Sequence, residues 1–236
     1  MSNIKYSIIC CYYNEINVLK KKFIPFINKL KNFPFSYEIF FCDNNSNDGT
    51  QKFLKEIENR KIPHLNFVYN NENLGKGGSI KKCISFSNGK FIAIFDIDEY
   101  LVDDLIKADN YLELNKQTQF LVGSRIMHQK KFIYKKNYYG VRIMTMLINF
   151  LFKTNISDAA GATKIFKKDI YEKLDIKTKN FDFEFDILCK FAKNGHHISE
   201  YPIEYFPRSV AEGKKLKAVQ DGSAILLTIL RNYFVK

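Results

Sequence analysis

Short apolar runs alternate with amphipathic segments through the first half of the chain. The runs predict strands at residues 6–11, 37–42, 65–69, 90–96 and 120–123. Apolar residues at helical spacing predict helices between them, at residues 16–33, 50–59, 77–88 and 101–115. Strict alternation of strand and helix is typical of an α/β fold, in which a mostly parallel sheet carries helices on both faces.

The second half of the chain is less regular. Residues 139–152 are amphipathic to wholly apolar, residues 181–193 and 218–234 have helical spacing, and residues 197–205 alternate as a strand does. No internal repeat or low-complexity linker interrupts the chain. The sequence therefore predicts a single domain, 1–236, with amphipathic helices toward its C-terminus.

Polar residues gather where the predicted strands end, at residues 12–15, 43–48, 96–99 and 124–125. In a parallel sheet these ends share one edge, and ligands bind in the crevice outside it. No G-x-G-x-x-G follows the first strand, which disfavours a dinucleotide-binding fold of the Rossmann kind. We therefore expect the functional site at this edge.

Asp96-Ile97-Asp98 follows the apolar run of the fourth predicted strand. Residues i and i+2 of a strand point to the same side, so the two carboxylates would lie together. Two like charges at that separation favour a shared cation, and Mg²⁺ or Mn²⁺ takes carboxylate oxygens. A solvated acidic turn is the alternative, because Glu99 and two further aspartates follow closely.

Composition narrows the class of ligand. The net charge is +12, from 37 Lys and Arg against 25 Asp and Glu, which suits phosphate-bearing ligands. The lysines are dispersed along the chain, so nucleic acid is not an expected partner.

The five cysteines show no C-x-x-C spacing and three lie in apolar runs, which predicts reduced, buried thiols in a cytoplasmic chain. No apolar run is long enough to span a membrane, and the N-terminus lacks a signal-peptide pattern.

Nine segments resemble, in order along the chain, the motifs of family 2 glycosyltransferases. Asp96-Ile97-Asp98, for example, matches the D-x-D motif. The segments are residues 7–15, 43–50, 73–78, 96–98, 123–125, 158–161, 183–184, 200–203 and 208–222. The likeness is closest to the branch that contains dolichyl-phosphate mannose and glucose synthases. It implies a GT-A fold, a nucleotide-diphosphate sugar donor, a Mg²⁺ or Mn²⁺ ion and inversion at the anomeric carbon. Residues 1–125 would form the donor half and residues 126–236 the acceptor half.

The chain departs from the family pattern at three places. Asn44 stands where the family has a second Asp, which falls at the expected base-recognition turn. Ala160 replaces a Ser, and residues 211–214 replace a Gly-x-Ser-Lys segment, both where the acceptor is expected.

The resemblance assigns most roles in the donor site. Asp98 is the expected metal ligand, and Asp96 would share the metal or reach the ribose. The nucleotide-sugar site would comprise Tyr12, Asn14, Glu15, Asp43, Gly75, Lys76, Asp96, Arg125, Arg208 and Lys214.

Some of these residues have structural alternatives. Tyr12 could be a core residue rather than a platform for the base, and Asp43 could cap a turn, as we expect of Asp48. The Gly75-Lys76-Gly77 segment could bind an anion or be an ordinary helix N-terminus. Arginine is scarce beside lysine, which favours phosphate contacts for Arg125 and Arg208, whereas Arg142 could be a surface residue.

Inverting transfer to a hydroxyl needs a general base, for which the candidates are Asp158, Asp182 and Glu184. A phosphate acceptor is already an anionic nucleophile and needs none, in which case Asp158 could orient the sugar.

The apolar segment 141–152 lies among lysines and could rest in a membrane interface, or form a core or homodimer helix. The terminal helix allows the same alternatives.

Taken together, the sequence predicts an inverting, metal-dependent glycosyltransferase that transfers a sugar from a UDP- or GDP-sugar to a lipid-linked or glycan acceptor. We expect it in the cytoplasm, with possible peripheral contact at the inner membrane face. A sugar-nucleotide-binding protein without transferase activity is the alternative.

Overall fold

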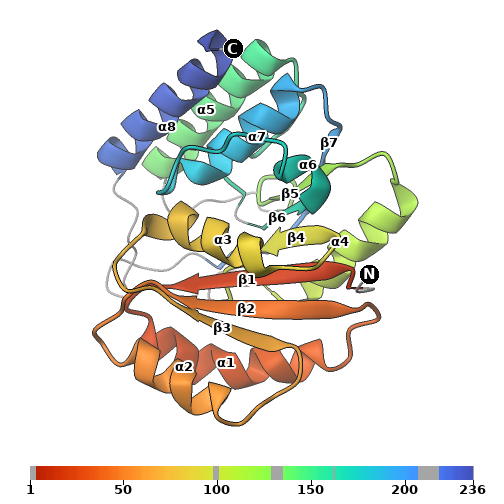
Figure 1. Cartoon of the computed structure of the whole chain (residues 1–236). Coiled ribbons are helices and arrows are strands. Elements are labelled where there is room, and N and C mark those ends of the chain that lie inside the picture. Colours follow the sequence, from red (N-terminus) through yellow and green to blue (C-terminus); the bar gives the residue numbers. More distant parts are fainter. Residues whose placement is uncertain (1–3, 98–100, 129–134, 162, 207–217, 236) are drawn as a thin grey trace.

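The computed structural model of the chain describes residues 4–97, 101–128, 135–161, 163–206 and 218–235 (Figure 1). These residues form a seven-stranded sheet with the order β3-β2-β1-β4-β6-β5-β7. Neighbouring strands run parallel, except that β6 is antiparallel to both β4 and β5. The strands are β1 (Tyr6–Tyr12), β2 (Tyr37–Asp43), β3 (Leu65–Tyr69), β4 (Phe91–Ile94), β5 (Phe120–Ser124), β6 (Lys164–Lys167) and β7 (Ile198–Pro202).

Helices cover both faces of this sheet, which is why its central strands read as continuous apolar runs. One face carries α1 (Ile16–Leu30), α2 (Thr50–Glu58) and α4 (Asp103–Leu114), which pack on alternate residues of β1 such as Ile8 and Cys10. The opposite face of β1, including Ile9, packs in a second apolar cluster. The helices of that cluster are α3 (Gly75–Phe86), α5 (Lys135–Phe152), α6 (Lys168–Tyr171), α7 (Phe183–Lys193) and α8 (Ala218–Phe234).

Helices α5, α7 and α8 pack against one another and form the upper part of the molecule in Figure 1. Ile148 of α5 and Ile229 of α8 are fully buried there, while other large apolar side chains of both helices are exposed. No helix in the described ranges is long and apolar enough to cross a membrane.

The alternation predicted from sequence is confirmed, with the four-residue strand β6 as an addition. Its short Lys-Ile-Phe-Lys segment carries too few positions to establish a period, so the apolar pattern gave no signal. The addition matters for the site. Because β6 runs antiparallel, its first residue, Lys164, pairs with Ile94 and Val122 near the carboxyl ends of β4 and β5.

Candidate active site

The candidate site lies at the edge of the sheet where the parallel strands end. Asp43 is the last residue of β2, Asp96 follows β4, and Arg125 follows β5. Lys164 reaches the same edge from the start of β6. Four segments far apart in sequence therefore bring two acidic and two basic residues to one edge, as the strand order predicts.

Asp43 combines a capped turn with an unused acceptor. Its carboxylate is fully buried, and Oδ2 accepts hydrogen bonds from the Ser46 N–H and the Gln51 side chain, both at 3.2 Å. Oδ1 is buried and has no hydrogen-bond partner among the described residues. A buried acceptor without a donor is costly, so a ligand N–H or O–H at this atom would be favourable.

Asp48, expected to be a cap, accepts from the first N–H groups of two helices. Its two oxygens accept from the Thr50 N–H at 2.9 Å and the Ile16 N–H at 3.0 Å. The turns after β1 and β2 are therefore fixed to one another.

The residues that follow β1 take part in the same linkage. Tyr12 is buried and its ring stacks on Phe41, with centroids 6.2 Å apart. Asn14 has a positive φ of 52°, its N–H donates to Ser46 Oγ at 2.8 Å, and its Oδ1 accepts from the Asn47 N–H. The Glu15 N–H donates to Thr50 Oγ1 at 2.9 Å. These bonds use mostly backbone groups of residues 14 and 15.

Asn44, the first departure from the family pattern, ties the end of β2 to the loop before α3. Its Nδ2 donates to Asn73 Oδ1 at 2.7 Å, and its Oδ1 accepts from the Leu74 N–H at 2.8 Å. An aspartate could not donate in this way when ionised, so Asn44 suits this loop as it stands.

Gly75 opens α3 in a conformation that requires glycine. Its φ is +75°, and a Cβ there would collide with the Lys179 carbonyl oxygen and the Asn180 side chain. The Gly75 N–H donates to Asn73 Oδ1, and the Gly78 N–H donates to Lys179 O, both at 2.9 Å. Two of the N–H groups at this helix N-terminus are therefore already satisfied within the chain.

A continuous series of ion pairs joins four residues in the order Asp96, Lys76, Glu184 and Lys164, and we call it the buried charge chain. Lys76 Nζ lies 2.8 Å from Asp96 Oδ2 and 2.8 Å from Glu184 Oε1. The other oxygen of Glu184, Oε2, lies 2.6 Å from Lys164 Nζ, which also donates to the Gly161 carbonyl. Lys164 is fully buried, so it depends on these partners for its charge.

Glu184 is ionised and firmly held in this arrangement. Burial alone would raise the pKa of its carboxyl group, but the charges of Lys164 and Lys76 outweigh that effect and lower the pKa to about 2. A carboxylate with so low a pKa is a weak proton acceptor at neutral pH.

Asp158 is the second buried carboxylate at this edge. Both of its oxygens accept from the Arg125 guanidinium at 2.8 Å, and Oδ2 also accepts from the Arg125 N–H. Burial opposes ionisation, but Arg125 prevails and the pKa of Asp158 is lowered. The guanidinium also lies over the ring of Tyr205, 5.1 Å from its centroid.

Glu200 supports this pair from β7. Its carboxylate accepts from the Ser157 N–H at 2.6 Å and from the Asp158 N–H at 2.9 Å. Arg142 donates to the Ser157 carbonyl at 3.3 Å, so it contacts the same loop.

Asp182, the third candidate base, lies at the N-terminus of α7. It accepts from the Thr228 hydroxyl at 3.1 Å and the Asn180 N–H at 3.3 Å. These partners of Asp182 are neutral, whereas Asp158 and Glu184 are paired with basic side chains. Three further predicted residues, Asp98, Arg208 and Lys214, lie outside the described residues.

No role was predicted for Lys164 from the sequence, and Glu200 was noted only as part of a segment that resembles a family motif. The one available signal for Lys164 was its position directly before the apolar pair Ile165-Phe166. It is weak, because most lysines lie at the surface.

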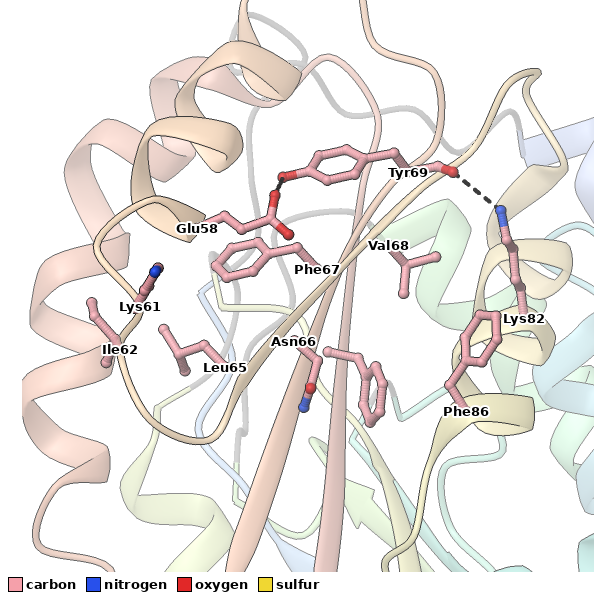
Figure 2. A pocket seen from close by; sticks show the side chains of 11 residues that line it. Glu58, Lys61, Ile62, Leu65, Asn66, Phe67, Val68, Tyr69, Lys82 and Phe86 are labelled. Carbon is pink, nitrogen blue, oxygen red and sulfur yellow. Dashed lines mark hydrogen bonds between the residues drawn. The ribbon is translucent and has the colours of Figure 1, made fainter.

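A surface hollow of about 580 Å³ lies along the edge strand β3 (Figure 2). In it the Tyr69 hydroxyl donates to Glu58 at 2.9 Å, and Lys82 Nζ donates to the Tyr69 carbonyl at 3.1 Å. None of the predicted site residues lines this hollow, so it is separate from the site at the strand ends.

Comparison with a solved structure defines the class of this fold. Glucosyl-3-phosphoglycerate synthase from Mycobacterium tuberculosis, solved with Mn²⁺, UDP and glucosyl-3-phosphoglycerate, aligns with a TM-score of 0.68. The alignment covers 99% of this chain and 81% of that chain at 12% identity, and it establishes a GT-A fold. The model of glycosyl transferase family 2 matches residues 7–175, well over half of the chain. The chain therefore belongs to glycosyl transferase family 2 and is a glycosyltransferase.

Two curated relatives are similar over most of their length. A dolichyl-phosphate beta-glucosyltransferase from Dictyostelium discoideum is 26% identical over 255 residues, covering 99% of this chain and 75% of the relative. A UDP-N-acetylglucosamine--dolichyl-phosphate N-acetylglucosaminyltransferase from Methanococcus voltae is 27% identical over 227 residues, covering 85% of this chain and 86% of the relative.

Proposed function

We propose that this glycosyltransferase moves a sugar from a UDP- or GDP-sugar to a polyprenyl-phosphate lipid, with inversion at the anomeric carbon. The two curated relatives act, by their names, on dolichyl phosphate, which is a polyprenyl-phosphate lipid. The observation that carries the proposal is the state of Asp158 and Glu184. Both carboxylates are ion-paired with lysine or arginine side chains. An acceptor that brings its own anionic oxygen needs no protein base.

The two halves of the chain would divide the work. Residues 1–125 would hold the donor, with Asp43 accepting a hydrogen bond from the base or ribose and Tyr12, Asn14 and Glu15 shaping that pocket. Lys76 and Arg125 of the donor half would contact the donor diphosphate, and residues 126–236 would hold the acceptor. Arg208 and Lys214 would add donor contacts from residues beyond those described.

The acidic residues at the strand end fit a hard divalent cation. Asp96 presents a carboxylate at the sheet edge, held at 2.8 Å by Lys76, and Asp98 follows two residues later. Carboxylate oxygens are the ligands that Mg²⁺ and Mn²⁺ take. When bound, the ion would supply positive charge to the departing nucleotide diphosphate.

Donor binding should be visible as a metal-dependent thermal shift. At a donor concentration of about 100 Kd, ligand binding adds about 2.7 kcal/mol to stability, or roughly 5–10 °C in Tm for a chain of this size. We expect one nucleotide sugar to give this shift with Mn²⁺ and to lose it with a chelator. No shift from any UDP- or GDP-sugar would contradict the proposed donor. The family match and the retained carboxylates disfavour a non-catalytic binding protein.

A lipid acceptor also requires access to a membrane surface. Helix α5 exposes Ile143, Met146 and Phe150, and the adjacent helix α8 exposes Leu227 and Phe234. Basic residues such as Lys153 and Arg231 lie on or beside the same helices. Exposed apolar side chains with flanking basic groups suit the interface of an anionic membrane. We propose that this surface rests on the membrane that carries the acceptor.

Replacement of Phe150 by glutamate tests that surface. Phe150 is 82% exposed, so the change leaves the core intact while placing a charge where lipid contact is proposed. We expect F150E to lose most cosedimentation with vesicles that contain an anionic lipid. The matched control is Leu114→Glu, because Leu114 is 86% exposed on α4, away from this surface, and should have no effect. Equal vesicle binding by F150E, or a dimer that F150E dissociates, would contradict the membrane assignment.

A further inference from the structure

Three cysteine side chains meet beneath the candidate donor site. Cys11 on β1, Cys42 on β2 and Cys83 on α3 place their sulfur atoms within 4.8 Å of one another. The function proposed above makes no use of them, and their spacing in sequence matches no metal-binding motif.

The sheet and helix geometry fixes this arrangement. Cys11 and Cys42 are direct partners in the parallel register of β1 and β2, so their side chains project to the same face. That face is covered by α3, which supplies Cys83. Cys10 shows the contrast, because the two-residue period of β1 sends it into the apolar cluster on the opposite face.

The surroundings of the three sulfurs are polar on one side. Asn70 Nδ2 lies 3.8 Å from Cys42 Sγ and donates to Ser79 Oγ at 2.9 Å. Lys82 Nζ donates to Asn70 Oδ1 at 2.9 Å, so a positive charge lies one residue away from the cluster. An N–H donor and a nearby cation favour the thiolate form, which is the form that binds metals. Cys11 as a whole is half-buried, whereas Cys42 and Cys83 are fully buried.

The ligand set selects a class of cation. Three sulfurs suit soft cations, whereas Mg²⁺ and Mn²⁺ prefer the oxygen ligands found at Asp96. In a tetrahedral zinc site with Zn–S bonds of about 2.3 Å, the sulfurs are roughly 3.8 Å apart. The observed separations therefore need only small movements to reach coordination distance.

We propose that Cys11, Cys42 and Cys83 bind one soft divalent cation of the Zn²⁺ and Cd²⁺ class, with solvent as the fourth ligand. Binding forms three metal–sulfur bonds, and the thiol protons leave to solvent without any change in oxidation state. The ion would join β1, β2 and α3 directly before Tyr12 and Asp43, and so stabilise the segments that carry the candidate donor site.

Cadmium titration of the full chain in a phosphine reductant tests the proposal, because thiolate–cadmium coordination absorbs in the ultraviolet. We expect one equivalent to produce the charge-transfer band, native mass spectrometry to show the displaced thiol protons, and Tm to rise. Cys11→Ser and Cys83→Ser should each weaken binding by more than about tenfold. The matched control is Cys189→Ser, because Cys189 is also fully buried but lies alone on α7, and it should bind as the parent chain does.

Two outcomes would overturn the proposal. One is that the unaltered chain shows no stoichiometric band and no bound cadmium by mass. The other is that Cys11→Ser, at the half-buried position where folding is least at risk, binds cadmium as tightly as the parent. Neither measurement depends on a sugar donor or acceptor, so a negative result would leave the proposed transferase function intact.

Discussion

Glu184→Gln is expected to lower the free energy of unfolding by about 3–5 kcal/mol, the usual cost of removing one partner from a buried ion pair. The reason is Lys164, which is fully buried and would lose the carboxylate 2.6 Å from its Nζ. Lys76 would lose a partner at the same time, leaving it with Asp96 alone among the contacts described. Urea unfolding at neutral pH measures the effect.

The pH dependence gives this prediction a sign. The pKa of Glu184 is about 2 in the folded chain against an ordinary 4.5. Its stabilising contribution, roughly 3 kcal/mol, is therefore complete above about pH 4.5 and is lost as the pH falls toward 2. The stability gap between the parent chain and E184Q should narrow at about pH 3.

A surface pair provides the control for Glu184. Glu172 lies 3.3 Å from Lys168 but is 57% exposed, so Glu172→Gln should change stability by less than about 1 kcal/mol. If E184Q matches E172Q at neutral pH, or if its deficit is the same at low pH, the buried charge chain does not stabilise the fold as described.

Asp98→Ala is expected to reduce turnover by at least about a hundredfold, because a metal ion contributes several kcal/mol to the stabilisation of developing charge. Asp98 comes two residues after Asp96 in the sequence, and Asp96 follows β4, where the metal is proposed to bind. Initial rates across a Mn²⁺ concentration series, on protein whose unfolding curve is unchanged, measure the effect. The expected result is a rate that no Mn²⁺ concentration restores.

A nearby acidic residue serves as the control for Asp98. Asp103 is half-exposed and pairs with Lys29 at 2.9 Å, so Asp103→Asn should retain nearly full activity and its Mn²⁺ dependence. Equal turnover by D98A and D103N would remove Asp98 from the metal site.

The pattern of apolar residues predicted the alternating strands and helices because each element was long enough to establish a period. The strand β6 was missed because it has four residues, two of them lysines. This omission affects the candidate site, because β6 brings Lys164 to the edge of the sheet where the parallel strands end. A fully buried lysine is an exception that only its partners explain, and those partners come from other elements.

In the candidate site, too, single residues could be singled out from the sequence, whereas their contacts with distant segments could not. Arg125 and Asp158 were each singled out in the sequence, but their bidentate pairing joins residues 33 positions apart. Glu184 was also singled out, as a candidate base, but its two lysine partners come from α3 and β6. Residue type and motif single out candidate residues, whereas the protonation and pairing of each group depend on contacts between distant segments.

The central claim is that the acceptor supplies the anionic nucleophile, and a comparison of two acceptors tests it most directly. A labelled nucleotide sugar identified by the thermal shift is incubated with the enzyme, Mn²⁺ and either a polyprenyl phosphate or the corresponding polyprenol. We expect labelled glycolipid from the phosphate and none from the alcohol. Equal transfer to the polyprenol, or transfer to a free glycan but not to the polyprenyl phosphate, would contradict the account.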